Sequence, residues 1–409
     1  MGSINSVVLY STTRLYDGDS ASSSRMTKYA KALANECKVY FFSVLDSDIS
    51  MDVVHEVKKN IFVVGKEKRY WNKITRRLNY PFKIIMFVRN MNKLMERLDK
   101  NAVFILYPSM TIFLDIVTIL YLIKFKKKKV FLEINEVRQY DPIFFSDPES
   151  LTFRQSLIFY LRKKKYIFNE ELSKYFKGLI CISTNIKKYY SNYNKNSIRI
   201  PILCDDFVEN KRGKKTYNPE EKFLIGFTGW ISFRKENLDL FFESLISLKK
   251  WFNNFEVHLY GPINDNVQNE LNKIVKDFGL SENIIYKGEV SQKELPSILK
   301  KFHLLILPRG FNLQNHYGFS TKLSEYLVSG VPTLSTRVSD NALYIKDNVN
   351  GFIVTPDSKT EITNKLKFII HNYNKIVPQI VENANKTVKK YFLYSNYSNV
   401  LKEFLCLKK

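Results

Sequence analysis

Residues 304–337 read LLILPRGFNLQNHYGFSTKLSEYLVSGVPTLSTR, and this stretch decides how the second half of the chain folds. Leu304–Leu307 is a short apolar run that predicts a buried strand. After a polar, aromatic loop, Gly318–Thr321 is expected to open a helix, with a small residue for close approach and hydroxyls suited to capping. The helix is predicted to stop at Gly330, and Val331–Thr336 is predicted as the next strand. The order strand, helix, strand is typical of a parallel α/β sheet.

A helix that begins at the carboxyl end of a strand presents backbone N–H groups to an anion. This helix also carries Glu325, whose carboxylate can accept hydrogen bonds from sugar hydroxyls. One ligand, a nucleotide sugar, could place a phosphate on the amides of the first turn and a sugar hydroxyl on the Glu325 carboxylate. The alternative, from the spacing alone, is an ordinary strand-helix unit with Glu325 on a solvated face.

The stretch resembles the donor-site segment of the retaining GT-B glycosyltransferases of family 4, the group 1 type of bacterial polysaccharide and glycoconjugate biosynthesis. The family pattern is roughly E-G-F/S-x5-E-A-x-A-x-G-x-P, and the sequence EYLVSGVP that starts at Glu325 matches its second half. The family's first Glu stands eight residues earlier, where this chain has Tyr317, preceded by His316. The resemblance implies that Glu325 binds the ribose. It also implies that His316, Tyr317, Gly318 and Phe319 contact the sugar.

A second segment, GFTGWISFRK at residues 226–235, resembles the family's G-R-x4-K-G motif, with Trp230 where Arg often stands. Counted from Gly229, Lys235 takes the place of the family's Lys, and Arg234 is its neighbour. Cations held near a diphosphate stabilise the negative charge that develops as the nucleotide leaves. The alternative is that Arg234 and Lys235 are ordinary surface cations in a chain that has 64 lysines and arginines.

Further donor contacts follow from the same resemblance. The backbone amides of Ser320 and Thr321 would add to the stabilisation of the diphosphate, and Glu325 is counted with the two cations as catalytic. The segment that ends at Val290 resembles the loop whose backbone meets the nucleobase. A plain strand-to-helix turn is a compatible alternative at that place.

Two segments of the first half are candidates for the acceptor side. Gly18 and Ser20 lie where the family carries a Gly-rich loop that faces the donor phosphates and the acceptor. Asn135 and Glu136 end another strand, where many family members have a His close to the reacting sugar. They either orient the acceptor hydroxyl or cap the end of the strand. Residues 17–19 form a D-x-D pair, to which the GT-B interpretation assigns no metal.

A chain of 409 residues is long enough for two domains, each with its own core. Both halves alternate short apolar runs with amphipathic ones, which predicts parallel sheets with helices on both faces. The predicted fold is α/β, with two tandem Rossmann-like domains and an interdomain cleft, the GT-B architecture. Residues 1–205 would hold the acceptor and residues 206–385 the nucleotide sugar, and the resemblance implies that a helix in residues 386–409 crosses back to the first domain. A separate helix is expected over Glu361–Ile370.

Neither a secretory signal pattern nor an apolar run of about 18 residues, the length of a spanning helix, is found in the sequence. Ile112–Phe125 comes nearest, but Asp115 and Lys124 interrupt it, and a buried helix is expected there. The four cysteines are Cys37, Cys181, Cys204 and Cys406. Their spacing suits neither a zinc site nor a disulfide framework, so a reducing cytosol is predicted.

The net charge of +24 predicts attraction to an acidic partner. The main basic runs are Lys66–Arg77, Lys124–Lys129 and Arg162–Lys165, with aromatic neighbours such as Tyr160 and Tyr166. Basic helices with aromatic neighbours can lie on an anionic leaflet, and nucleic acid is attracted to the same kind of surface. Because no nucleic-acid fold signature is present, contact with a membrane that holds a lipid-linked acceptor is preferred. The alternative is a solvated, lysine-rich surface.

These patterns predict a cytosolic glycosyltransferase of the hexosyltransferase type, peripheral on the inner face of the cell membrane. It would move a sugar from a nucleotide-diphosphate sugar to a glycan, lipid-linked or protein acceptor with retention of anomeric configuration, without a metal or a cofactor. One alternative is a sugar-nucleotide epimerase on the GT-B fold, and another is a non-catalytic basic protein that binds nucleic acid or lipid. P-loop and nucleophile-elbow motifs are absent from the sequence.

Overall fold

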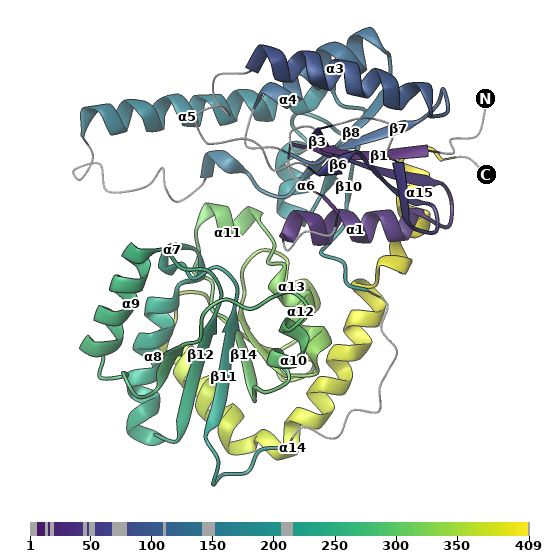
Figure 1. Cartoon of the computed structure of the whole chain (residues 1–409). Helices are drawn as coiled ribbons and strands as arrows, with labels where there is room; N and C mark the ends of the chain where they lie inside the picture. Colours follow the sequence, from purple (N-terminus) through teal and green to yellow (C-terminus); the bar gives the residue numbers. More distant parts are fainter. Residues whose placement is uncertain are drawn as a thin grey trace. The chain divides into compact units, whose positions relative to one another are not determined.

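The computed structural model describes residues 6–12, 15–16, 20–43, 47–48, 54–67, 80–108, 112–140, 152–205 and 216–407. The predicted acceptor residue Gly18, the D-x-D pair of residues 17–19 and the basic residues 68–77 lie outside these ranges. The chain divides into two compact units (Figure 1). Unit 1 comprises Met1–Gln139, Phe144–Asp205 and Tyr394–Lys409, and unit 2 comprises Tyr140–Ile143 and Asp206–Leu393.

Unit 1 is built on an eight-stranded sheet in the order β10-β9-β8-β7-β1-β2-β5-β4. Its strands are β1 (Ser6–Ser11), β2 (Lys38–Ser43), β4 (Val54–Lys58), β5 (Ile61–Val64), β7 (Val103–Leu106), β8 (Lys129–Ile134), β9 (Gly178–Cys181) and β10 (Ser197–Arg199). Neighbouring strands are parallel except β4, which pairs antiparallel with β5. The central strand β1 is buried along its whole length, as a strand covered by helices on both faces requires.

The helices of unit 1 connect these strands. They are α1 (Ala21–Leu33), α3 (Tyr80–Glu96), α4 (Ile112–Val117), the π-helix Thr118–Phe125, α5 (Phe153–Glu171), α6 (Thr184–Tyr190) and α15 (Ser398–Phe404), with short 3-10 turns at Arg138–Tyr140, Leu172–Tyr175 and Tyr394–Tyr397. A small antiparallel pair, β3 (Ser47–Asp48) and β6 (Lys66–Glu67), stands apart from the main sheet.

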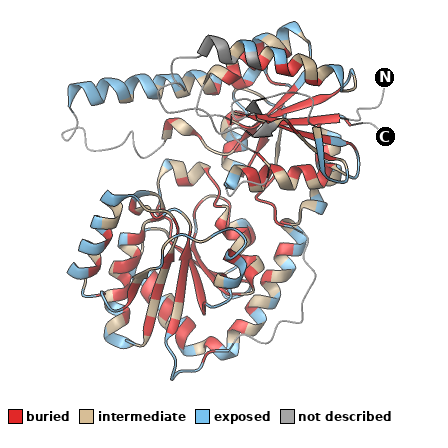
Figure 2. Ribbon diagram, in the orientation of Figure 1, coloured by how far each residue is buried: buried red, intermediate tan, exposed pale blue. Residues whose placement is uncertain are grey.

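Unit 2 has a six-stranded, fully parallel sheet in the order β13-β12-β11-β14-β15-β16. Its strands are β11 (Phe223–Thr228), β12 (Phe255–Tyr260), β13 (Ile284–Tyr286), β14 (Leu304–Leu307), β15 (Thr333–Thr336) and β16 (Phe352–Val354). Its helices are α7 (Phe233–Glu236), α8 (Leu238–Trp251), α9 (Asp265–Asp277), α10 (Leu295–Leu299), α11 (Leu313–Tyr317), α12 (Lys322–Ser329), α13 (Asn341–Tyr344) and α14 (Lys359–Tyr391). Two α/β units with largely parallel sheets confirm the predicted fold class, and Figure 2 shows most strands in the colour of buried residues.

Two predicted helices differ from the structure. The helix expected over Glu361–Ile370 continues as α14 to Tyr391, with Pro378 inside it. Proline removes one backbone hydrogen bond, but a buried apolar face that continues through Val377 and Ile380 keeps the helix packed.

The segment Ile112–Phe125 is helical and lies between two strands, as expected, but it is buried on one side only, where Leu114, Val117 and Leu122 lie. It begins as α4 and continues as a π-helix, and Leu120 and Phe125 are 62% and 71% exposed. Within the ranges that the structure describes, no helix combines the length and the apolar character needed to cross a membrane.

The end of the chain completes the core of unit 1. After α14, the Tyr394 N–H donates to the Cys204 carbonyl oxygen over 3.2 Å. Leu401 and Leu405 of the following segment are fully buried among residues of the β1 and α1 region. The last residues therefore contribute apolar packing to the unit that also contains the first residues.

In unit 2, two glycines pack backbone against backbone where β11 and β12 end. Gly229 has φ +112° and its N–H donates to the Tyr260 carbonyl oxygen over 2.8 Å. Gly261 has φ +137°, and a Cβ on it would lie 2.2 Å from the Gly229 carbonyl oxygen. Only glycine fits such an approach, so Gly261 fixes the path of the loop that starts at Gly229.

We expect Gly261→Ala to destabilise unit 2 by about 2–4 kcal/mol, because it adds a backbone clash to an unfavourable φ. The matched control is Gly279→Ala, which also has a positive φ (+65°) but meets nothing within 4 Å and should cost about 1 kcal/mol. Urea unfolding of the intact protein measures both. Equal losses for the two variants would show that the backbone contact is unimportant.

Candidate functional site

Helix α12 starts without a side-chain cap, which corrects the sequence-based expectation. Its N-cap residue Thr321 has helical dihedral angles and makes no capping hydrogen bond. The Ser320 hydroxyl is buried and has no hydrogen-bond partner among the described residues. Glu325 lies in the first turn and is half-buried. Gly330 ends the helix with φ 77°, as predicted.

Neither the Ser320 nor the Thr321 backbone N–H donates to another group in the described part of the chain. Buried polar groups are normally paired, so a buried unpaired hydroxyl next to two unpaired amides is suited to an anionic ligand. Ser320 and Thr321 were predicted as donor-site residues because they lie in a strand-helix connection. The structure shows in addition that their donors are unsatisfied.

The loop before α12 is tied to the segment that carries the two predicted cations. The Asn315 side-chain amide donates to the Lys235 carbonyl oxygen over 2.8 Å and to the Gly310 carbonyl oxygen over 3.0 Å. The Asn312 amide donates to the Arg234 carbonyl oxygen over 3.4 Å, while its oxygen caps α11. Two segments about 80 residues apart in sequence, which motif matching had linked, are thus adjacent in the folded chain.

The two predicted cations belong to α7, a single turn that Ser232 caps by accepting from the Lys235 N–H. The Arg234 side chain is exposed and the Lys235 side chain is half-buried. The turn ends at Asn237, which adopts the left-handed conformation with φ 56°. Both cations therefore stand on a short, capped element at the end of β11.

A buried ionic cluster joins the end of α7 to the start of α12, and the sequence analysis did not predict it. Glu236 accepts from Arg309 Nη2 over 2.9 Å and Nε over 3.1 Å, and from Lys322 Nζ over 2.7 Å. The three residues are 2%, 8% and 8% exposed for Glu236, Arg309 and Lys322. Two cations share one carboxylate, so the cluster keeps one excess positive charge inside the protein.

This arrangement shifts the pKa values of Glu236 and Lys322. Burial alone would raise the pKa of Glu236, but the two adjacent cations outweigh it and hold that pKa well below its usual range. Burial lowers the pKa of Lys322 to about 8, although Glu236 opposes this effect. Lys322 is therefore still mostly protonated near neutral pH.

Lys322 also packs against Gly229, whose φ of +112° already favours glycine. A Cβ at Gly229 would lie 2.4 Å from the Lys322 Cε atom. The Lys322 ammonium lies 4.7 Å from the centre of the Phe227 ring, a cation-π contact. The sequence signal was available: Lys322 opens the same helix as Glu325, within the quoted motif. The sequence does not show that the Lys322 ammonium points into the protein, towards Glu236.

The remaining predicted donor residues lie on the same unit. His316 and Tyr317 are half-buried, with ring centres 5.0 Å apart. Gly318 and Phe319 are buried, and Phe319 packs against Tyr344 at 5.5 Å. Val290 packs partly buried against the cluster that contains Tyr326.

Strand β11 is joined to α12 through a tyrosine. The Thr228 N–H donates to the Tyr326 hydroxyl over 2.9 Å in a fully buried contact. The residue before Gly229 and the residue after Glu325 are thus fixed to each other, so the two predicted motifs share one rigid connection.

In unit 1, the predicted acceptor residues have local partners. Ser20 caps α1 by accepting from the Ser23 N–H over 3.1 Å. The Asn135 amide donates to the Tyr107 hydroxyl over 2.5 Å. Glu136 is half-buried and, with Asn135, lines a cavity of about 30 Å³.

Glu133, two residues before Asn135, belongs to the core. It accepts from Arg25 Nε over 2.5 Å and from the Tyr29 hydroxyl over 3.0 Å. Arg25 also donates to the Pro201 and Ile200 carbonyl oxygens over 2.7 and 2.8 Å. With every partner satisfied, this ion pair joins α1 to β8 and is structural.

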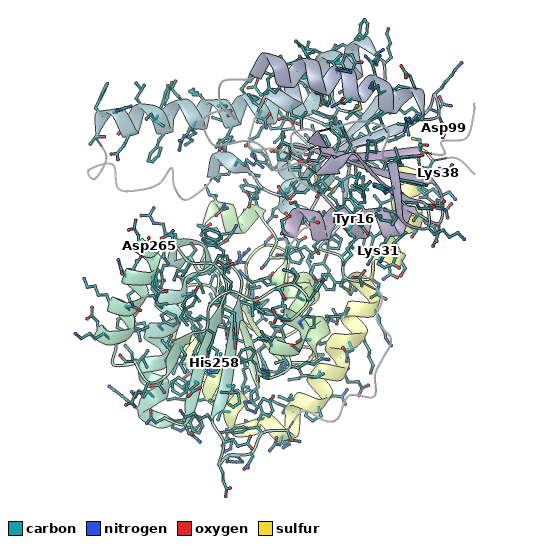
Figure 3. All side chains as sticks on the ribbon, viewed as in Figure 1. Tyr16, Lys31, Lys38, Asp99, His258 and Asp265 are labelled. Carbon is teal, nitrogen blue, oxygen red and sulfur yellow. The ribbon has the colours of Figure 1, made fainter. Side chains whose placement is uncertain are left out.

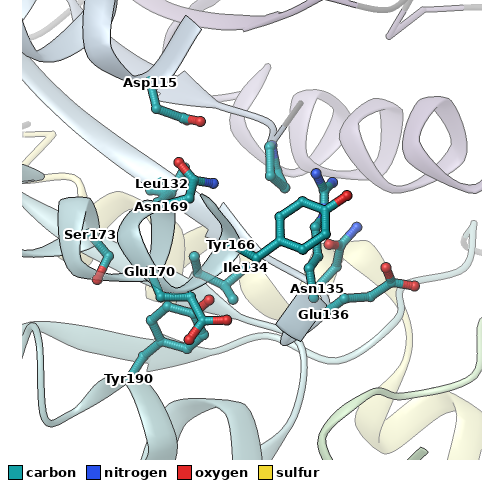
Figure 4. A pocket seen from close by; sticks show the side chains of 12 residues that line it. Asp115, Leu132, Ile134, Asn135, Glu136, Tyr166, Asn169, Glu170, Ser173 and Tyr190 are labelled. Atoms are coloured by element: carbon teal, nitrogen blue, oxygen red, sulfur yellow. The ribbon is translucent and has the colours of Figure 1, made fainter. Parts of the chain in front are cut away.

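The small cavity of unit 1 lies at the carboxyl end of β8, between α4 and α5 (Figure 4). It has room for about one water molecule. Oxygen atoms of Asp115, Asn169, Glu170 and Ser173 have no hydrogen-bond partner among the described residues. Burial raises the pKa of Asp115 and that of Glu170 each to about 7.

Two further features of the described residues complete the survey. No group of three or more His, Cys, Asp or Glu side chains in these ranges is arranged to hold a metal ion. His258 on β12 (Figure 3) lies 2.7 Å from Glu256 on the same strand, so this histidine has a local polar partner.

Comparison with known proteins identifies the family of unit 2. Residues 208–387 match the family model described as glycosyl transferases group 1. Unit 2 is therefore similar to the group 1 glycosyl transferases over almost its whole length. The chain is 24% identical over 255 residues to an uncharacterized 41.2 kDa protein in the cps region of Klebsiella pneumoniae, an alignment that covers 59% of this chain and 66% of that protein.

Solved structures show the same fold over nearly the whole chain. Sucrose-phosphate synthase from Thermosynechococcus elongatus superimposes with a TM-score of 0.70, at 12% identity and 98% coverage of both chains. Anabaena HepE in complex with UDP-glucose gives a TM-score of 0.64 at 14% identity, covering 98% of this chain and 99% of that one. The predicted GT-B fold is thereby confirmed.

We expect Glu236→Gln to cost about 3–5 kcal/mol of stability at neutral pH, because it leaves two buried cations without a carboxylate. The depressed pKa of Glu236 means that its contribution is complete above the ordinary Glu pKa of about 4.5 and is lost as the pH falls towards its folded value. Urea midpoints at several pH values should therefore show a shallower acid dependence in the variant. The control Glu220→Gln, at an exposed position, should change stability by less than about 0.5 kcal/mol.

The raised pKa of Asp115 should make the stability of unit 1 depend on pH in the opposite direction to that expected from Glu236. Its pKa is raised to about 7 by burial, so the folded protein binds a proton that the unfolded chain releases between the ordinary Asp pKa of 3.8 and pH 7. Stability should fall as the pH rises through that window. The free energy of unfolding in urea should be higher at pH 5 than at pH 7.5. We expect Asp115→Asn to reduce this difference by roughly 1–3 kcal/mol. The control Asp277→Asn, at an exposed site, should leave the difference intact.

Proposed function

We propose that this protein is a glycosyltransferase that moves a sugar from a nucleotide-diphosphate sugar to a glycan, lipid-linked or protein acceptor, with retention of anomeric configuration. The observation that carries the proposal is the excess positive charge of the Glu236, Arg309 and Lys322 cluster, held behind the unpaired donors that open α12. A site of this kind favours a diphosphate over a neutral ligand.

The roles of the donor residues follow from their positions. Lys235 and Arg234 stand on α7 and would stabilise the departing diphosphate, with the Ser320 and Thr321 amides acting from the end of α12. Glu325, in the first turn of the same helix, would accept hydrogen bonds from the ribose hydroxyls.

The sugar and the base would be held by the flanking segments. His316 to Phe319 would contact the sugar. Tyr317 occupies the position of the family's first Glu, and its role would pass to His316 or to a backbone amide of Gly318 or Phe319. The backbone near Val290 would meet the base, and Gly229 allows the loop to approach the phosphates closely.

In the proposed reaction the bond between the anomeric carbon and the diphosphate oxygen breaks while the acceptor oxygen bonds to the same carbon. The acceptor attacks directly, so no nucleophile of the protein is required, and its proton passes to the departing diphosphate, which therefore takes the place of a protein base. The proposal includes no metal and no cofactor beyond the nucleotide sugar. HepE, which shares the fold, is known in complex with UDP-glucose, and this supports UDP-sugars as the first donors to test.

The acceptor and the place of action belong to the same proposal. Unit 1 would bind the acceptor, with Ser20, Asn135 and Glu136 as its candidate contacts. The relative in the cps region supports a role in bacterial polysaccharide or glycoconjugate biosynthesis. We place the protein in the cytoplasm, peripheral on the inner face of the membrane, where a lipid-linked acceptor would be available.

A donor screen followed by calorimetry tests this proposal. Hydrolysis of a panel of nucleotide sugars selects the donor, and the corresponding nucleoside diphosphate is then titrated into the protein. Lys235→Ala and Glu325→Ala should each weaken binding about tenfold or more, the effect of losing a hydrogen bond to a charged group. Lys273→Ala, which removes an exposed lysine of α9, should bind like the unaltered protein.

Unchanged binding in both site variants would overturn the assignment of the donor site. Anomeric proton signals of the transfer product, compared with those of the donor, test retention separately. Conversion of the donor sugar into its epimer without any acceptor would instead favour an epimerase.

A further inference from the structure

We infer that helix α5 is a membrane-docking element that lays an apolar stripe into an anionic lipid surface. The stripe consists of Phe153, Leu157, Leu161 and Phe168, which are 86%, 48%, 57% and 49% exposed. This inference deepens the proposed function by naming a partner, but binding of lipid does not require the transfer reaction. Figure 2 shows most of α5 in the colour of exposed residues.

The four apolar side chains lie on one face of the helix. At 100° per residue, positions 153, 157, 161 and 168 fall within about 80° of its circumference. The face that contacts unit 1 is on the opposite side, because Tyr166 and Glu170, about 180° away, line the cavity described above. The stripe therefore points away from the core of its own unit.

Local interactions, more than packing, stabilise the outer turns of this helix. Thr152 and Gln155 form a reciprocal capping box, with the Gln155 N–H donating to the Thr152 hydroxyl and the Gln155 side chain accepting from the Thr152 N–H. Residues 153–158 are all exposed. A helix that is capped but hardly packed holds its apolar side chains in solvent, an unfavourable state unless a partner covers them.

Cations lie within the stripe and beside it. At 100° per residue, Lys164 falls inside the arc of the stripe, Arg154 and Lys165 fall just beyond its edge, and Arg162 lies farther round the helix. Arg154, Arg162, Lys164 and Lys165 are exposed, and Lys164 lies 5.5 Å from the ring centre of Tyr160, which is itself 57% exposed. An interfacial helix combines these features: the apolar side chains enter the boundary between headgroups and acyl chains, the aromatic ring lies among the headgroups, and the cations meet anionic lipid.

Charge decides between a bilayer and the other possible occupants. A second copy of this chain would bring the same positive charge, from a molecule of net charge +24, against the helix. Nucleic acid would neutralise the cations but would leave Leu157 and Leu161 in water. An anionic bilayer satisfies the cations and covers the apolar stripe at the same time.

The test is sedimentation of the full-length protein with vesicles, comparing about 30% phosphatidylglycerol in phosphatidylcholine with pure phosphatidylcholine. The unaltered protein should bind the anionic vesicles and leave the neutral ones largely free. Leu157→Ser combined with Leu161→Ser should lower the partition coefficient about tenfold. Lys164→Gln combined with Lys165→Gln should lower it about fivefold or more, most clearly at low salt.

The matched control is Leu343→Ser in unit 2, since Leu343 and Leu161 are both 57% exposed. This variant should bind vesicles like the unaltered protein. Circular dichroism and hydrolysis of a soluble nucleotide sugar should be unchanged in the Leu157 and Leu161 variant, which separates loss of docking from loss of folding or of the donor site.

Three results would overturn the inference. Equal vesicle binding by the stripe variant and the control would show that α5 does not dock. A dimer of the unaltered protein that becomes a monomer in the stripe variant would assign the stripe to a second copy. Binding to RNA that the stripe variant retains, without any binding to vesicles, would assign the basic helix to nucleic acid.

Discussion

One carboxylate that holds two buried cations is the interaction on which the donor region of unit 2 depends. Glu236 at the end of α7 pairs with Arg309, which follows β14, and with Lys322 at the start of α12. The pairing keeps β14, α7 and α12 in fixed relation and leaves a net positive charge beside Gly229. Because desolvating charges is costly, such a cluster is tolerated where an anionic ligand can gain from it.

Each unit has its own kind of polar interior. Unit 2 keeps its buried carboxylate ionised through cations, whereas the cavity of unit 1 keeps Asp115 and Glu170 near the protonated form through burial. The buried pair of Arg25 and Glu133 in unit 1 is fully satisfied and needs no ligand. Burial by itself therefore does not mark a functional group, and the unsatisfied partners are the more informative observation.

Much of the fold and part of the candidate site could be predicted from local sequence. Alternating apolar runs predicted the parallel sheets, and Gly330 marked the end of α12 because only a residue tolerant of positive φ suits that position. Pro378 misled the prediction of α14, since tertiary packing of its apolar face outweighs one lost hydrogen bond. The expected cap of α12 was also wrong, because hydroxyl spacing does not reveal whether the chain turns in the geometry that a cap needs.

The sequence by itself determined the α/β class, the family resemblance and the place of Lys235 and Glu325 in motifs, because these depend on periodicity and spacing along the chain. Only the tertiary structure decided that Lys322 points inward to Glu236 and that the Ser320 hydroxyl is left unpaired. It also decided which face of α5 is turned away from unit 1. Side-chain direction and pairing between distant residues arise from packing, which no local pattern encodes.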